Sequence, residues 1–182
     1  MAPMPERIEI DENEALRRHE VDDAQALLDV VLRNLDELHL WMPWAKDPPT
    51  LEFERGFIAE SIEHWEQGVT HNMLAVRGDD ILGGFGFWPV PEGAGERKGE
   101  WELGYWLDRA SWGRGICTRS VLAIIDAARA NVGVTRFRIV CDEANIRSAA
   151  VAQRAGFALG STVTGEQASP GDSGIKQIWT RG

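Results

Sequence analysis

A strand–loop–helix–strand pattern in the second half of this 182-residue chain constrains the fold most strongly. Glu100–Leu107 and Thr135–Cys141 have the length and composition of strands, and Ile116–Asn131 places apolar residues at helical spacing. Two strands joined through one helix lie parallel, with a right-handed crossover. Ligands of such sheets bind at the carboxyl ends of the parallel strands, which directs attention to residues 106–115.

Hairpin patterns on both sides of this unit predict antiparallel neighbours. The further predicted strands are Arg7–Ile10, Ala15–Arg18, Asn72–Arg77, Ile81–Trp88, Ala158–Thr164 and Ile175–Thr180. Three further helices are predicted: one capped by Asp22 and Gln25 and running to Leu38, one from Thr50 to Gly68, and one over Asn145–Ala155. The predicted fold class is α/β, or α+β by some schemes. It has a mixed, mostly antiparallel sheet, a central parallel strand–helix–strand unit and helices on both faces, in one domain over residues 1–182.

Composition narrows the environment and the partners. The net charge of −10 argues against sequence-independent binding of nucleic acid, and it favours a cationic partner such as an amine. No run of about 18 apolar residues predicts a membrane span, and residues 1–7 lack the pattern of a signal peptide. Cys117 and Cys141 are too few for a disulfide framework, so a reduced, cytoplasmic protein is expected. The four histidines show no ligand spacing, so no metal is expected. His71, at a strand start, could face the cleft, but a position at the surface is favoured.

The loop over Ser111–Thr118 leads directly into a predicted helix. Gly113 and Gly115 allow a close approach of the backbone, and the free amides of a first helical turn favour an anion. Arg109 and Arg114 add positive charge, so the loop fits a phosphate or pyrophosphate. A plain strand–helix turn is the alternative. The P-loop lysine and the third glycine of a dinucleotide fingerprint are missing, so neither of those nucleotide-binding folds is supported.

The motifs, taken in order, resemble the GCN5-related N-acetyltransferases (GNAT), and within them the ribosomal-protein (RimJ/RimL-like) branch. The matching segments are Leu16-Arg17, Asp23-Ala24, Trp41-Met42-Pro43-Trp44, Glu102–Leu107, Trp112–Thr118, Asn145–Ser148 and Gly156-Phe157. They cover nearly the whole chain. One departure is Ala110, where the superfamily often has Gln or Arg. The backbone of the loop does not depend on that side chain.

The resemblance implies that acetyl-CoA binds between two parallel strands that splay apart. Backbone groups near Trp106 and Leu107 would pair with the pantetheine arm in the manner of an added strand, and loop amides would hold the pyrophosphate. Asn145 would contact the arm, cap its helix, or do both. The implied cofactor-binding residues are Trp106, Leu107, Arg109, Trp112, Gly113, Arg114, Gly115, Ile116, Cys117, Asn145 and Ser148. For Cys117, a core-facing position is favoured over a role as nucleophile.

The resemblance also implies catalytic residues. Ser148 matches a serine proposed to donate a hydrogen bond to the leaving thiolate, although a first-turn serine also satisfies backbone groups. Glu166 and Glu102 are the leading candidates for the general base, with Glu100 third; each could instead be a solvated carboxylate. An α-amine acceptor could dispense with a base, since its pKa is about 7.7–8.0 against about 10.4 for lysine.

The expected function is acetyl-CoA-dependent transfer of an acetyl group to a primary amine, either a protein N-terminal α-amine or a small-molecule amine. The implied acceptor-binding residues are Trp41, Met42 and Trp44, whose alternative is ordinary core. An open groove there would suit a peptide and a closed pocket a small molecule. Two other hypotheses are a non-catalytic acyl-CoA-binding or sensing module and a nucleotide-binding domain. A homodimer is compatible with the branch.

Overall fold

The computed structural model describes residues 3–91 and 99–182, and the prediction of one domain over residues 1–182 stays a prediction. In this part of the chain, eight strands form one sheet in the order β1-β2-β3-β4-β5-β6-β8-β7. The strands are β1 (Arg7–Glu9), β2 (Ala15–Arg18), β3 (His71–Arg77), β4 (Asp80–Pro89), β5 (Glu100–Leu107), β6 (Arg136–Asp142), β7 (Ala158–Thr164) and β8 (Ile175–Arg181). The mixed, mostly antiparallel sheet confirms the predicted fold class.

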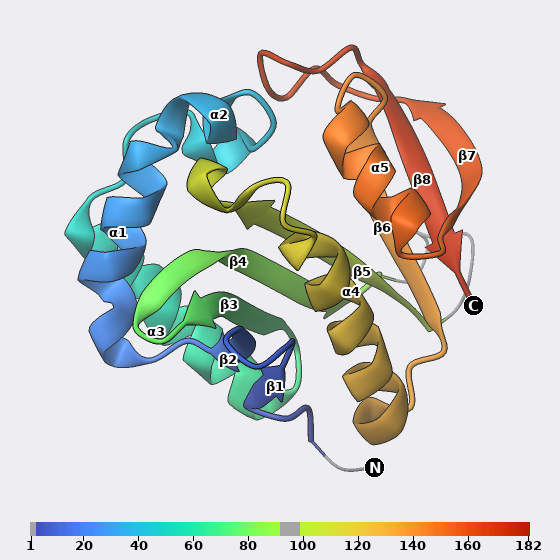
Figure 1. Cartoon of the computed structure of the whole chain (residues 1–182). Coiled ribbons are helices and arrows are strands. Elements are labelled where there is room, and N and C mark those ends of the chain that lie inside the picture. Colours follow the sequence, from blue (N-terminus) through green and yellow to red (C-terminus); the bar gives the residue numbers. More distant parts are fainter. Residues whose placement is uncertain (1–2, 92–98) are drawn as a thin grey trace.

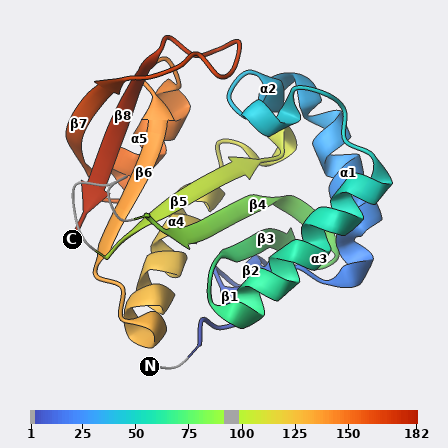
Figure 2. The same ribbon diagram turned by 180° about the vertical axis from the view of Figure 1, so that it is seen from behind.

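Helices cover both faces of the sheet (Figures 1 and 2). They are η1 (Val21–Asp23), α1 (Ala24–Arg33), α2 (Leu35–His39), η2 (Pro43–Ala45), α3 (Leu51–Gln67), η3 (Arg109–Ser111), α4 (Ile116–Ala127), η4 (Ala128–Val132) and α5 (Ile146–Arg154). One core cluster contains the inner face of α4 and the other that of α1. Fully buried side chains such as Ile124 and Leu27 each contribute about 1.5–3 kcal/mol by leaving water.

The parallel strands β5 and β6 pair over a short stretch and then diverge. Glu100–Glu102 pair with Arg136–Arg138, and no further pairs form within the described parts of the two strands. Beyond that point β5 continues to Leu107 beside β4, whereas β6 continues to Asp142 beside β8. We call β1–β5 the first arm and β6–β8 the second arm. Both views show the arms separating towards α2 and the start of α5.

The first long helix is interrupted where the sequence predicted continuity. Asn34 separates α1 from α2, and its buried amide donates to the carbonyl of Val30 (2.8 Å) and to Oδ1 of Asp108 (3.1 Å). Its Oδ1 accepts from the backbone N–H of Arg109 (2.9 Å). Apolar spacing continues through the break, so the pattern concealed it. The hydrogen bonds of Asn34 at this break connect the helix to the loop that follows β5.

The predicted capping box of Asp22 and Gln25 is wrong. The turn η1 leads into α1, and Asp23 accepts from the backbone N–H of Glu20 (2.7 Å) while pairing with Arg17 (2.6 Å). Gln25 instead donates to Asp29 within the helix (2.8 Å). The α-helix therefore begins at Ala24, one residue later than a cap at Asp22 predicts, and the turn η1 precedes it. No helix within the described residues is long and apolar enough to cross a membrane.

Candidate active site

The divergence leaves one edge of β5 facing the gap between the arms. Asp108 donates its N–H to the carbonyl of Leu82 (2.8 Å), and Glu100 accepts from the N–H of Val90 (2.9 Å). Backbone groups alternate in direction along a strand, so the even-numbered residues of β5 direct theirs to β4. The backbone groups of the odd-numbered residues Leu103, Tyr105 and Leu107 therefore point towards β6. That strand no longer pairs with β5 beyond Glu102.

The free edge differs in detail from the expectation for Trp106 and Leu107. The alternation turns the backbone of Trp106 towards Gly84, and a Cβ on Gly84 would stand 2.6 Å from the Trp106 indole. The carbonyl of Leu107 accepts from Nε1 of Trp112 (3.1 Å). This leaves the backbone of Tyr105 and the N–H of Leu107 directed into the gap.

The glycine loop opens the first turn of α4. Gly113 (φ 77°) and Gly115 (φ 72°) are exposed, as is Arg114 between them, and an added Cβ on Gly113 would meet nothing within 4 Å. The bond from Arg119 N–H to the carbonyl of Gly115 (3.1 Å) opens the helix, so the preceding amides have no intrahelical acceptor. The loop thus presents free amides, a helix N-terminus and open space, which suits an anion such as pyrophosphate.

Asp108 fixes the start of this loop. Its carboxylate accepts from Arg33 (2.5 Å), from Asn34 and from the backbone N–H of Ala110 (3.2 Å). Burial opposes ionisation, but the hydrogen bonds from Arg33 and Asn34 outweigh it and lower the pKa of Asp108. An ionised, fully bonded Asp108 therefore ties the loop to the helix break. Burial raises the pKa of the Cys117 thiol, which packs against the core as expected.

Charged groups from α2, η3 and α5 lie close together where the two arms are separated. The guanidinium of Arg147 stands 4.2 Å from the ring centre of Trp112. The carboxylate of Glu37 pairs with two arginines: its Oε1 lies 3.5 Å from Nη1 of Arg109, and its Oε2 lies 3.8 Å from Nη1 of Arg147. Sequence reasoning missed Arg147 and Glu37, because only the spatial approach of α2, α5 and the loop brings them together.

Ser148 lies at the centre of a polar cluster that spans the gap. Oδ1 of Asn145 caps α5 by accepting from the N–H of Ser148 (3.1 Å), which confirms the capping interpretation. Oγ of Ser148 is 3.1 Å from the hydroxyl of Tyr105, and the thiol of Cys141 on β6 lies near enough for Ser148 to influence its pKa. Burial raises the pKa of both Tyr105 and Cys141. A strand of each arm and α5 thus converge on one hydroxyl.

The opposite face of β5 carries Glu102 and a row of tryptophans. Glu102 accepts from Nε (2.7 Å) and Nη2 (2.6 Å) of Arg138, at the last pair before the arms diverge. The ring of Trp88 covers Gly86 and Gly104, where an added Cβ would come within 2.7 Å of it. Glu100, the third candidate base, is 3% exposed at the start of the strand.

The predicted acceptor residues line the first arm near this face. Trp44 is 44% exposed, and its ring centre lies 6.4 Å from that of Trp106. Met42 packs against the core, while Trp41 is partly buried. The exposed ring of Trp44 is therefore the part of this segment most available to a ligand.

The β7–β8 loop, residues 165–174, crosses from the second arm to the first. Gly171 donates to the carbonyl of Leu40 (2.9 Å) and passes so close that an added Cβ would stand 3.0 Å from the ring of Trp41. Glu166 is exposed and has no polar partner among the described residues. The β7–β8 loop therefore contacts the segment that follows α2.

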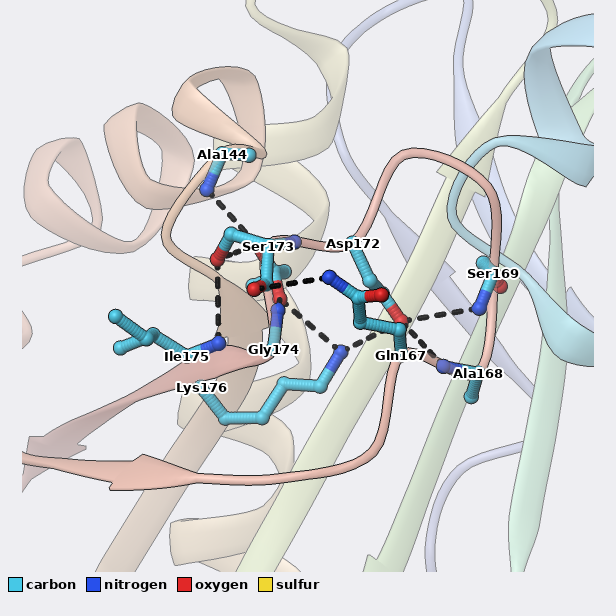
Figure 3. A network of polar contacts seen from close by, with 10 residues as sticks. Ala144, Gln167, Ala168, Ser169, Asp172, Ser173, Gly174, Ile175 and Lys176 are labelled. Atoms are coloured by element: carbon cyan, nitrogen blue, oxygen red, sulfur yellow. Dashed lines mark hydrogen bonds and ion pairs between the residues drawn. The ribbon is translucent and has the colours of Figure 1, made fainter.

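Asp142 anchors this loop from inside (the network in Figure 3). Its carboxylate accepts from the N–H (2.9 Å) and hydroxyl (2.7 Å) of Ser173, and from the N–H groups of Gly174 (3.2 Å) and Ala144 (3.0 Å). Lys176 bridges Asp142 (3.4 Å) to Asp172 (2.8 Å). Burial acts against ionisation, yet the bonds from Ser173 and its neighbours dominate and lower the pKa of Asp142.

These features define the class of the protein: an acyltransferase fold in which a splayed parallel pair meets a glycine loop at a helix start. The acetyltransferase (GNAT) domain model matches residues 15–158. The chain therefore belongs to the GNAT family of acetyltransferases, as its motifs predicted.

Known proteins similar to the chain agree with this assignment. The ribosomal-protein-serine acetyltransferase of Escherichia coli (strain K12) is 25% identical over 159 residues, which cover 86% of this chain and 85% of that protein. The structure of RimL, a ribosomal L7/L12 alpha-N-protein acetyltransferase, in complex with coenzyme A superposes with a TM-score of 0.88 at 24% identity, covering 97% of both chains. The microcin C7 self-immunity acetyltransferase MccE, in complex with acetyl-CoA and AMP, gives 0.86 at 22% identity, covering 97% of this chain and 96% of that one.

No group of three or more His, Cys, Asp or Glu side chains placed to hold a metal occurs within residues 3–91 and 99–182. The potential ligands of the site are engaged otherwise. Glu102 is paired with Arg138, and Asp142 is bonded to Ser173 and Gly174.

Proposed function

We propose that this chain transfers an acetyl group from acetyl-CoA directly to a primary amine, either a protein N-terminal α-amine or a small-molecule amine. The observation that carries the proposal is the confined pairing of β5 with β6, which leaves a free strand edge next to Ser148. The name of a similar protein, a ribosomal-protein-serine acetyltransferase, supports a protein amine as the acceptor. Two free thiols favour a cytoplasmic location.

The residues present suit the pantetheine arm and the pyrophosphate of coenzyme A. The backbone of Tyr105 and the N–H of Leu107 offer strand-like partners to the amides of the pantetheine arm. The loop amides around Gly113 and Gly115 would hold the pyrophosphate, and Arg109 and Arg147 at the mouth add positive charge.

Three groups of the chain are proposed to assist the transfer: a backbone N–H of β5, the Ser148 hydroxyl and a carboxylate. When bound, acetyl-CoA supplies the acetyl group as a thioester whose sulfur leaves as a thiolate. An N–H on the free edge of β5 donates to the carbonyl oxygen as negative charge develops there. Ser148 donates a hydrogen bond to the departing sulfur. The amine nitrogen bonds to the carbonyl carbon as the carbon–sulfur bond breaks, and its surplus proton passes to a carboxylate and finally to the thiolate.

Glu166 is proposed as that carboxylate. Its side chain is exposed on the β7–β8 loop, whereas the carboxylate of Glu102 is engaged in an ion pair with Arg138. We expect Glu166→Gln to lower kcat/KM for a lysine-like amine about 100-fold at neutral pH. The loss should shrink as pH approaches the pKa of the amine. Glu102→Gln should chiefly lower stability. A larger kinetic loss in Glu102→Gln than in Glu166→Gln would assign the base to Glu102.

The position of the coenzyme A thiol can be tested by disulfide trapping. One similar structure carries coenzyme A in a disulfide with a cysteine of that protein. Here Ser148 lies near enough to Cys141 to influence its pKa, so a sulfur that accepts from Ser148 lies close to the Cys141 thiol. With coenzyme A disulfide, the Cys141 thiolate should form a mixed disulfide and release one coenzyme A thiolate. The reaction should accelerate as pH rises, because burial raises the pKa of Cys141.

Mass spectrometry of the labelled protein reads this result directly. Cys117→Ala should retain the coenzyme A adduct, and Cys141→Ala should lose it. An adduct on Cys117 rather than Cys141 would place the thiol elsewhere and contradict the proposed orientation of the cofactor.

A further inference from the structure

We infer that Tyr105 is a positioning residue that sets the direction in which the Ser148 hydroxyl donates. The inference rests on the proposed role of Ser148 as donor to the leaving sulfur. It adds a side chain of the first arm to the stabilisation of the leaving sulfur, which Ser148 on α5 otherwise provides alone.

The geometry brings the tyrosine hydroxyl to the serine from across the gap. Tyr105 lies on β5, on the same face as Leu103, and its ring packs 6.2 Å from that of Phe85. Its hydroxyl stands 3.1 Å from Oγ of Ser148 and 3.2 Å from the Ser148 carbonyl oxygen. Among the described residues, Ser148 therefore supplies both hydrogen-bond acceptors that the tyrosine proton reaches.

Counting protons shows why this contact matters. Each hydroxyl has one proton, and Oγ of Ser148 has two neighbours, the Tyr105 hydroxyl and the Cys141 sulfur. If Tyr105 donates to Oγ, the serine proton is left for a sulfur. If Tyr105 donates to the carbonyl instead, the tyrosine oxygen becomes a competing acceptor that can draw the serine proton away from a thiolate. A thiolate only accepts, so its presence selects the first arrangement.

The environment keeps Tyr105 in the donating form. Burial raises the pKa of its phenol, so the proton stays on the tyrosine at neutral pH. A neighbour that always donates to Oγ also increases the polarity of the serine O–H bond, because hydrogen bonds in a chain polarise one another.

A double-mutant cycle separates this role from a structural one. Ser148→Ala should lower kcat about 100-fold, and Tyr105→Phe should lower kcat three- to tenfold, about the worth of one hydrogen bond. Tyr105→Phe should change the KM for acetyl-CoA less than about twofold, since a hydrogen bond made only as the sulfur leaves affects kcat rather than binding. In the Ser148→Ala background, Tyr105→Phe should have no further effect on kcat.

A second measurement changes the acidity of the Tyr105 hydroxyl without removing it. Tyr105 is the single tyrosine of the chain, so biosynthetic incorporation of 3-fluorotyrosine changes this hydroxyl alone. The more acidic phenol is a stronger donor. We expect it to lower the pKa of the thiol of bound coenzyme A, followed by ultraviolet absorbance of the thiolate, whereas Tyr105→Phe should raise that pKa.

The outcomes distinguish the inference from the proposed function. Equal losses from Tyr105→Phe with and without Ser148, or an unchanged thiol pKa in both tyrosine variants, would overturn the role of Tyr105 and leave the transferase intact. An unchanged kcat in Ser148→Ala would overturn the proposed role of Ser148 and the inference with it.

Discussion

Replacing Asp142 with alanine is expected to lower the free energy of unfolding by about 3–5 kcal/mol, as when one partner of a buried charged network is removed. The Asp142 side chain is 1% exposed, and it accepts from Ser173, Gly174 and Ala144 while pairing with Lys176. Alanine would leave those donors and the ammonium without their acceptor. For a chain of this size the melting temperature should fall by about 2–4 °C for each kcal/mol.

The same substitution should also impair activity, because Asp142 fixes two parts of the site. Ala144 belongs to the turn before α5, which carries Ser148, whereas Ser173 and Gly174 end the loop that carries Glu166. Chemical denaturation and steady-state kinetics of the variant test both effects. Asp126→Ala, at an exposed position on α4, is the control and should change neither. A loss below about 1 kcal/mol would contradict the account, since surface substitutions alone reach about half of that.

The effect of Asp142 should depend on pH in a defined direction. The pKa of Asp142 is lowered by folding, so the folded state holds its proton less tightly than the unfolded state, whose pKa is about 3.9. The stabilisation is therefore fully present above about pH 5 and is lost as pH falls through the unfolded and then the folded pKa. The difference in stability between the wild type and Asp142→Ala should narrow below about pH 4. A constant difference would show that the charge of Asp142 contributes nothing.

Gly113→Ala should reduce the affinity for acetyl-CoA at least tenfold, a loss of about 1.4 kcal/mol or more. In the free protein an added Cβ at Gly113 meets nothing within 4 Å, so the fold tolerates it apart from the positive φ of 77°. A left-handed conformation costs a non-glycine residue roughly 1–2 kcal/mol. A pyrophosphate held by the loop amides would lose its close approach to the backbone.

Gly78→Ala is the matched control for this prediction. Gly78 also has a positive φ (56°) and open space around an added Cβ, but it lies in the turn between β3 and β4. Both variants should lose similar stability, and only Gly113→Ala should bind acetyl-CoA more weakly in calorimetric titrations. Equal affinity in the two variants would remove the loop from the proposed cofactor site.

The elements of this fold were largely predictable because their signals are local. Two-residue alternation and turn residues such as Gly78 and Asp79 identified the hairpins, and the glycine loop lies where the predicted strand–helix unit placed it. The break at Asn34 was missed, because its cause is a contact with Asp108, 74 residues away in the sequence. The expectation that His71 lies at the surface is wrong. It is 4% exposed and stacks on Trp101 at 5.8 Å.

The sequence predicted which residues belong to the candidate site, but it did not predict the side chains that they contact. Ser148 and Glu102 were named from their motifs, but neither the Tyr105 hydroxyl beside Ser148 nor the Arg138 ion pair of Glu102 has a signal in the sequence. Such pairs depend on strand register and on where the arms diverge, and tertiary packing determines both. Arg147, stacked on Trp112, was missed for the same reason.

The most direct test of the central claim is a thermal-shift comparison of acetyl-CoA, coenzyme A, ATP and NAD at one concentration. A ligand at 100 times its Kd stabilises the folded state by about 2.7 kcal/mol, which corresponds to a rise of roughly 5–11 °C in Tm for a chain of this size. The account predicts such a rise with acetyl-CoA and coenzyme A, and a smaller one with ATP or NAD. No shift with acetyl-CoA, or a larger shift with ATP or NAD, would contradict the claim that the gap between β5 and β6 binds coenzyme A.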